Sequence, residues 1–83
     1  MREVEITLKS IDDVKQFVQT LTMFEGEFEV ISGKYIVDAK SILGLFSVDL
    51  SKPVVLRIGA ADAEDVLHAI SRYRINGSLV NGQ

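Results

Sequence analysis

The strongest fold signal in this chain is Asp38-Ala39-Lys40-Ser41-Ile42-Leu43-Gly44-Leu45-Phe46-Ser47, in which a serine precedes a run of apolar residues. Serine is a preferred N-cap, because its hydroxyl oxygen accepts a hydrogen bond from a free N–H group in the first turn of a helix. The pattern predicts a short helix that begins after Ser41 and ends near Val48, before a loop over residues 49–53. A helix of about two turns cannot bury every apolar side chain against one sheet. We therefore expect at least two of Ile42, Leu43 and Phe46 to be exposed.

Strand and helix patterns also precede this segment. Residues 3–9 alternate between polar and apolar side chains, which is the period of a strand with one face in water. Ser10 then offers an N-cap, and apolar residues at helical spacing predict a helix over about residues 11–23. Residues 27–38 contain two short strands that meet in a hairpin at Gly33, since glycine readily supplies the positive φ of a tight turn. The strands of this hairpin are Glu27–Ile31 and Lys34–Asp38.

Two further elements follow the short helix. Residues 54–58 alternate as a strand, and Asp62 is placed to cap a helix that contains Val66, Leu67, Ile70 and Tyr73. Residues 74–83 have no sustained periodicity, and we interpret them as a turn and tail. The order βαββαβα predicts an α+β fold with a four-stranded antiparallel sheet and three helices on one face.

The alternation also predicts which side chains face the helices. The open face of the sheet should carry Glu3, Glu5, Glu27, Glu29 and Arg57. The opposite face should bury Val4, Ile6, Phe28, Val30, Leu56 and Ile58 against Phe17, Leu21, Leu67 and Ile70. One contiguous core is expected.

Length and composition restrict the class of protein. We expect residues 1–83 to form a single small domain, and the absence of cysteine excludes a disulfide framework or a thiolate zinc site. Twelve acidic and nine basic residues give a net charge of −3, which disfavours non-specific binding to nucleic acid or anionic membranes. Neither a signal peptide nor a membrane-spanning stretch is recognisable, so we expect a cytoplasmic protein with protein partners. No residue pattern suggests a metal site or a cofactor.

The element order and the Lys40-Ser41-Ile42 helix start resemble the HPr (histidine-containing phosphocarrier) family. The resemblance is closest between Phe24 and Ser47 and continues less tightly to about Tyr73. It implies the open-faced β-sandwich of that family and a relation to the phosphoenolpyruvate-dependent sugar phosphotransferase system. It also implies that the protein is not itself an enzyme.

The family's phosphoryl-accepting histidine begins its first helix, in a His-Ala-Arg-Pro-like motif. Counting back from Ser41 without a gap places that histidine on Ser10, its arginine on Asp12 and its proline on Asp13. The resemblance therefore implies a divergent HPr without the carrier histidine, acting as a non-catalytic regulatory or protein-binding module. A divergent phosphocarrier is the alternative, and a plain N-cap is the simpler reading of Ser10. The only histidine in the sequence, His68, is in the last predicted helix, and we read it as a partly exposed helix residue.

Ser41 is the regulatory candidate. In Gram-positive HPr proteins the matching serine is phosphorylated by HPr kinase, which implies the same modification here, while a plain N-cap is the alternative. The resemblance further implies that Ile42, Leu43 and Phe46 form a protein-binding patch for HPr kinase or for phosphotransferase-system and regulatory proteins. Core packing beneath the following loop is the alternative for these three residues.

Overall fold

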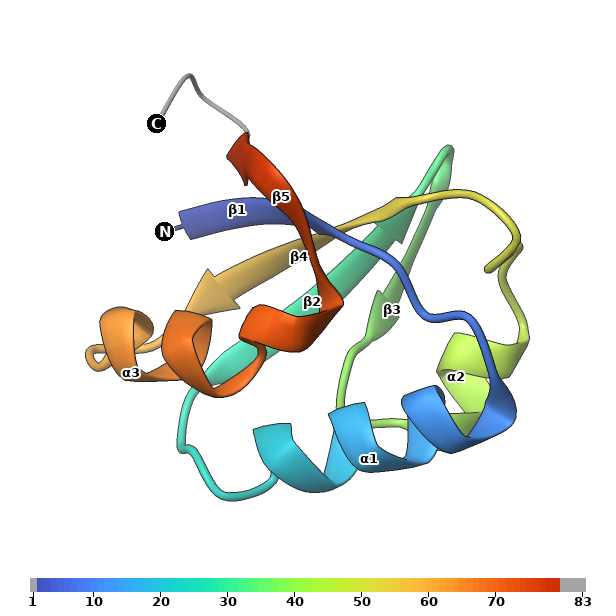
Figure 1. Ribbon diagram of the computed structural model, residues 1–83. Coiled ribbons are helices and arrows are strands. Elements are labelled where there is room, and N and C mark those ends of the chain that lie inside the picture. Colours follow the sequence, from blue (N-terminus) through green and yellow to red (C-terminus); the bar gives the residue numbers. More distant parts are fainter. Residues whose placement is uncertain (1, 80–83) are drawn as a thin grey trace.

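The computed structural model describes residues 2–79, which form an antiparallel sheet with helices on one face (Figure 1). The elements in chain order are β1 (Arg2–Ile6), α1 (Ile11–Leu21), β2 (Glu27–Ser32), β3 (Tyr35–Asp38), α2 (Ile42–Phe46), β4 (Val54–Gly59), α3 (Ala63–Ala69), the 3₁₀ turn η1 (Ser71–Tyr73) and β5 (Arg74–Leu79). The predicted α+β class is confirmed, as is the placement of three helices on one face.

The sheet has five strands, not four, in the order β3-β2-β4-β1-β5. The interpretation of residues 74–83 as turn and tail was wrong for residues 74–79, which form β5; residues 80–83 lie outside the described part of the chain. β5 pairs with β1, with a register shift between Val4 and Ile6. Its polar and glycine-containing sequence has no strand period, so this strand depends on the hydrogen-bonding groups that the edge of β1 presents.

The predicted core is confirmed. Residues of alternating strand positions and of one helix stripe are buried together. The fully inaccessible members include Phe17 and Leu21 of α1, Leu45 of α2, Leu56 of β4 and Ile70 after α3. Because Leu45 is buried completely, it anchors α2 beneath the sheet although that helix is very short.

The open face carries a charged row across three strands. Register places Glu3 opposite Arg57 and Arg57 opposite Glu29. The guanidinium group donates from Nε to Glu3 at 3.1 Å and from Nη1 to Glu29 at 3.1 Å, and these bonds raise the pKa of Arg57. The predicted acidic face is confirmed at these positions, with one arginine holding two of its carboxylates.

Helix ends follow the predicted caps at two of three positions. Ser10 and Ser41 cap α1 and α2 with their side chains, whereas the side chain of Asp62 makes no capping hydrogen bond at α3. The prediction that the side chain of Asp62 caps this helix was therefore wrong, although α3 does begin directly after Asp62. Asp62 has φ −101° and ψ 45°, whereas Ser10 and Ser41 have the extended backbone typical of an N-cap.

No helix within residues 2–79 has the length and apolar character needed to cross a bilayer.

Candidate functional site

Ser10 is the N-cap residue of α1. Its Oγ accepts a hydrogen bond from the N–H of Asp13 at 3.0 Å, and Oδ2 of Asp13 accepts one from the N–H of Lys9 at 2.9 Å. The first bond satisfies one of the free N–H groups of the helix start, and the second holds the residue before the cap against the first turn. Asp12 and Asp13 also place two carboxylates in the first turn, where they complement the helix dipole.

Ser41 occupies the equivalent position in α2. Its Oγ accepts from the N–H of Gly44 at 3.0 Å, and the residue is half-buried. The neighbouring Lys40 does not turn toward it: Nζ of Lys40 donates to the carbonyl oxygen of Phe24 at 2.7 Å and lies 5.0 Å from the ring centroid of Phe28. The cation next to Ser41 in sequence is therefore engaged elsewhere.

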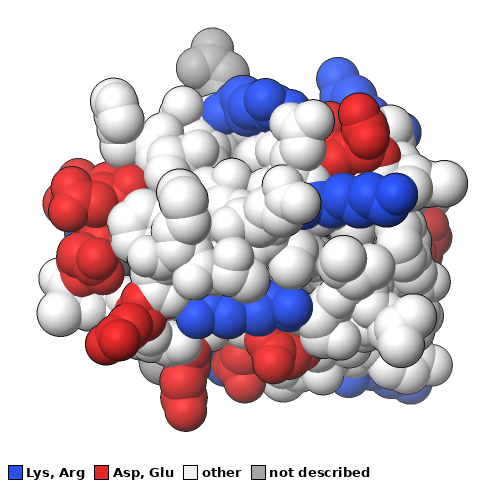
Figure 2. Space-filling view, turned by 90° about the horizontal axis from the view of Figure 1, so that it is seen from below, with Lys and Arg blue, Asp and Glu red and all other residues white. Residues whose placement is uncertain are grey.

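Three side chains of α2 face solvent, and we call them the α2 patch. The exposed fractions are 38% for Ile42, 83% for Leu43 and 44% for Phe46. This agrees with the expectation that a helix of this length cannot bury them all. In Figure 2 the acidic side chains gather mainly toward the edge where α3 lies, and much of the remaining surface on this face is uncharged.

A hollow of about 430 Å³ brings the start of α1 and the end of α2 together. Its lining includes Ser10 and Ile11 on one side, Phe46 on the other, and Leu8 and Leu50 from the adjoining loops. Ile11 is 64% exposed, so an apolar side chain of α1 extends the α2 patch across this hollow. The sequence analysis assigned no role to Ile11, whose spacing of three residues from Val14 is compatible with the buried stripe.

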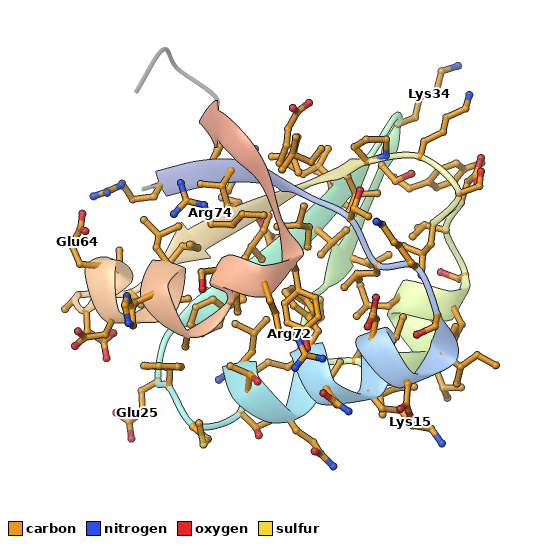
Figure 3. The ribbon with its side chains drawn as sticks, viewed as in Figure 1. Lys15, Glu25, Lys34, Glu64, Arg72 and Arg74 are labelled. Atoms are coloured by element: carbon orange, nitrogen blue, oxygen red, sulfur yellow. The ribbon has the colours of Figure 1, made fainter. Side chains whose placement is uncertain are left out.

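His68 lies apart from this surface. It is exposed on α3 and lines a separate hollow with Arg2, Glu64, Ser71 and Arg74. Glu64 and Arg74 lie toward the α3 end of the molecule, away from Lys15 on α1 (Figure 3), and Glu64 forms an ion pair with Arg2. The structure thus does not bring the histidine to the helix start that Ser10 caps.

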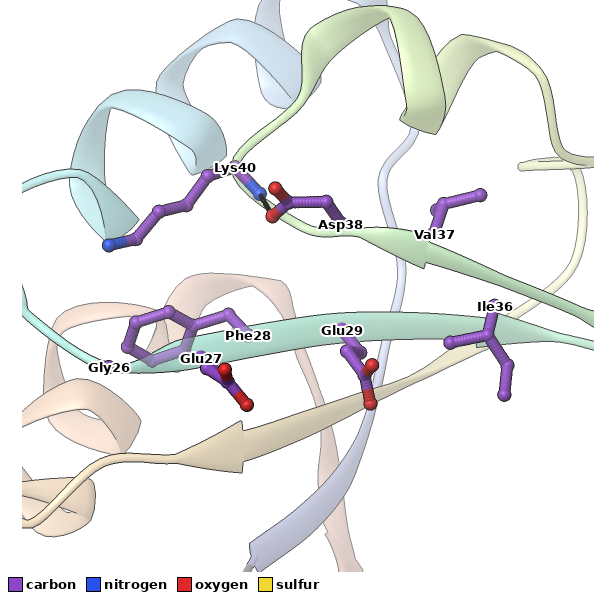
Figure 4. Close-up of a pocket in the computed structure, with 8 residues that line it drawn as sticks. All are labelled: Gly26, Glu27, Phe28, Glu29, Ile36, Val37, Asp38 and Lys40. Carbon is purple, nitrogen blue, oxygen red and sulfur yellow. Dashed lines mark hydrogen bonds between the residues drawn. The ribbon is translucent and has the colours of Figure 1, made fainter.

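A further hollow of about 340 Å³ lies where β2 and β3 diverge (Figure 4). Its lining combines Glu27, Glu29 and Asp38 with the single cation Lys40, whose Nζ bonds the Phe24 carbonyl. This composition is unsuited to an anionic ligand. Among residues 2–79 no group of three or more histidine, aspartate or glutamate side chains could hold a metal ion.

Comparison with solved structures identifies the family. The chain is 30% identical to a structure described as HPr-C-His from Thermoanaerobacter tengcongensis, with a TM-score of 0.76 over 87% of this chain and 89% of that one. The chain belongs to the HPr family. A second HPr structure, the histidine-containing phosphocarrier protein from work on the divergence of Mycoplasma from Gram-positive bacteria, shares the fold at a TM-score of 0.67. It is 16% identical and covers 84% of this chain and 85% of its own.

Neither a protein-family model nor a curated protein sequence matches the chain. The HPr assignment consequently stands on the structural comparison. It places Ser10 and the α2 patch in an HPr fold.

Proposed function

We propose that this HPr-like protein is a cytoplasmic regulatory or protein-binding module of the phosphotransferase system that carries no phosphoryl group on histidine. The observation that supports it most directly is the start of α1. The ungapped count from Ser41 puts Ser10 where the family has its histidine, and Oγ of Ser10 accepts the N–H of Asp13. His68, the only histidine, lies on α3.

The chemistry of the two residue types supports the same proposal. A neutral imidazole titrates near physiological pH and forms a labile phosphoramidate, which suits reversible transfer. A serine hydroxyl without a base is a poor nucleophile, and its phosphate ester is a poor onward donor. Asp12 and Asp13 add negative charge in the same turn and repel an approaching phosphate.

Regulation through Ser41 is the second part of the proposal. Lys40-Ser41-Ile42 matches the helix start that HPr kinase modifies in Gram-positive relatives, and Ser41 lies beside the exposed α2 patch. A phosphate on Ser41 would add up to two negative charges next to this surface and would displace the bond from the Gly44 N–H. Its effect would therefore be on partner binding at the α2 patch.

The α2 patch, with Ile11 across the hollow, is the proposed docking surface. Single exposed apolar residues are common on any protein, but here three occupy one short helix, and Phe46 among them lines the same hollow as Ile11, which is the kind of surface that partners cover. The partners we propose are HPr kinase and phosphotransferase-system or regulatory proteins.

The first experiment is intact-mass measurement after incubation with HPr kinase and ATP. We expect the protein and its Ser10→Ala variant each to gain one phosphoryl group, and Ser41→Ala to gain none. Ser10→Ala is the matched control, because it removes the same hydroxyl from the other helix cap. Absence of any gain in the unmodified protein would remove Ser41 regulation from the proposal.

The second experiment tests the divergent phosphocarrier alternative. The protein is incubated with enzyme I and phosphoenolpyruvate, with an HPr that contains the family histidine as positive control. We expect no transfer to this chain. An acid-labile phosphoryl group on it would establish the alternative and refute the non-carrier proposal.

A further inference from the structure

The strand β3 lies at one edge of the sheet. It pairs with β2 on one side, and within the described chain no strand lies on the other side. Tyr35 and Ile36 of this strand are 69% and 56% exposed. Natural proteins usually blunt such edges, because unpaired strand backbone attracts another strand.

The backbone of Ile36 points away from β2. The N–H of Ala39 donates to the carbonyl oxygen of Phe28 at 2.9 Å, so Ala39 faces β2. In an antiparallel pair successive residues alternate in direction, which turns Val37 toward β2 as well and leaves Ile36 and Asp38 facing outward. Ile36 therefore presents both an N–H donor and a carbonyl acceptor at the free edge.

The sequence of this edge is complementary to itself. Residues 34–38 read Lys-Tyr-Ile-Val-Asp, with a cation two residues before Ile36 and a carboxylate two residues after it. If two copies lie antiparallel about a two-fold axis at Ile36, Lys34 of each faces Asp38 of the other. Lys34 extends from the tip of the hairpin into solvent (Figure 3), and no ion pair engages Lys34 or Asp38 among the described residues. Oδ1 of Asp38 accepts the N–H of Lys40 at 2.9 Å (Figure 4), so Oδ2 is the oxygen that would meet the lysine of the other copy.

The neighbouring strands extend this complementarity over the open face. Register aligns Val55, Ile31 and Ile36 in one apolar row that stops at the free edge, and Ile36 points to the same side as Glu29 (Figure 4). A second copy would continue this row. In the adjacent row Glu29, which already bonds Arg57, lies directly opposite Asp38, and the partner copy's lysine would add a second cation beside these two carboxylates.

We propose that two copies of this chain associate through β3, antiparallel and centred on Ile36, to form one continuous ten-stranded sheet. The interface is isologous, with Ile36 against its own copy and two Lys34–Asp38 ion pairs. The helices of both copies lie on the same side of the joined sheet, because the two-fold axis is perpendicular to it. A pairing of such short strands buries less area than a permanent dimer, so the association is reversible and depends on concentration. It is independent of the function proposed above.

The test is sedimentation equilibrium of the full chain over a wide concentration range. We expect a monomer–dimer equilibrium that weakens with added salt, since the ion pairs are exposed. Lys34→Asp and Asp38→Lys should each weaken dimerisation by about tenfold or more, because like charges then face each other at both ends of the interface. An equimolar mixture of the two variants should recover the association as a heterodimer, in which every facing pair is again of opposite charge.

Two controls separate β3 from other surfaces. Leu43→Lys alters the exposed α2 patch and should leave the dimer unchanged, whereas Ile36→Lys should abolish it. Circular dichroism verifies the fold of each variant, and recovery in the mixture excludes misfolding as the cause of the losses. A chain that stays monomeric at all concentrations overturns the proposal. So does a dimer that is insensitive to the charge reversals, or one that Leu43→Lys disrupts.

Discussion

The rings of Phe17 and Tyr73 meet edge to face, with centroids 5.5 Å apart and planes at 87°. This contact joins the middle of α1 to the residue that immediately precedes β5. The carbonyl oxygen of Tyr73 accepts the N–H of Thr7 at 2.8 Å, so the same residue also connects to the end of β1. Tyr73 is 5% exposed and fixes the position from which β5 can pair with the sheet.

Burial of Tyr73 predicts a loss of stability in alkali. Desolvation raises the pKa of its phenol above the ordinary value of 10.0. Because the pKa of Tyr73 is higher in the folded than in the unfolded chain, burial of the neutral phenol stabilises the fold fully below the unfolded pKa. This stabilisation is lost as the pH rises through the folded pKa. Chemical unfolding at increasing pH should show a decline that starts near pH 10 and is smaller in Tyr73→Phe. An identical decline in both proteins would exclude Tyr73 as its source.

The two serine caps should each contribute measurably to stability. Ser10→Ala and Ser41→Ala remove the bonds to Asp13 and Gly44, and each should lower the free energy of unfolding by about 1 kcal/mol. Asp62→Ala is the matched control, because Asp62 makes no capping bond, and should cost only a few tenths of a kcal/mol. Urea unfolding measures the free energy of unfolding of all three variants. Equal losses at the three positions would contradict this assignment of caps.

Gly26 and Gly33 should differ in how well they tolerate substitution by alanine. Gly26 has φ +132°, and a Cβ there would lie 2.8 Å from both the carbonyl oxygen of Gly59 and the Cβ of Ala60. Gly26→Ala should therefore cost about 3 kcal/mol, from strain and steric overlap together. Gly33 has φ +60° with open space around it, so Gly33→Ala should cost only about 1 kcal/mol. Thermal unfolding of the two variants would reveal any reversal of this order.

Arg57 should stabilise the open face in a salt-dependent way. Arg57→Gln leaves Glu3 and Glu29 without their shared cation, so the midpoint of thermal unfolding should fall. The fall should shrink at high salt, because ions screen the remaining repulsion. Arg2→Gln, at the more exposed Arg2–Glu64 pair, should have the smaller effect. A larger loss for Arg2→Gln would contradict the central role of Arg57.

Phe46 should be the anchor of the proposed docking surface. Phe46→Ala should weaken binding of HPr kinase by more than about 1 kcal/mol, because aromatic anchors carry much of the energy of an interface. Calorimetric titration measures this affinity, and Tyr35→Ala, at an exposed aromatic residue on β3, serves as control. Unchanged affinity in Phe46→Ala, or an equal loss in Tyr35→Ala, would place the interface elsewhere.

Local sequence patterns were sufficient to predict most of the helices and strands of the fold. The alternation in residues 27–38 and 54–58 and the serines at 10 and 41 act over a few residues, so their hydrogen bonds and buried faces could be read without distant contacts. The exposure of the α2 patch also followed from local geometry, because five helical residues cannot turn every side chain toward one sheet.

Contacts between distant segments account for the remainder. β5 has no period of its own and becomes a strand beside β1, whose edge supplies the hydrogen bonds it needs. Ile11 has the spacing of a buried residue and is nevertheless 64% exposed, at the rim of the hollow that separates the start of α1 from Phe46. The hollow between Ser10 and Phe46 joins residues far apart in sequence. Periodicity specifies which face of an element is apolar, whereas only the packing of the whole chain specifies which edges and end turns find a neighbour.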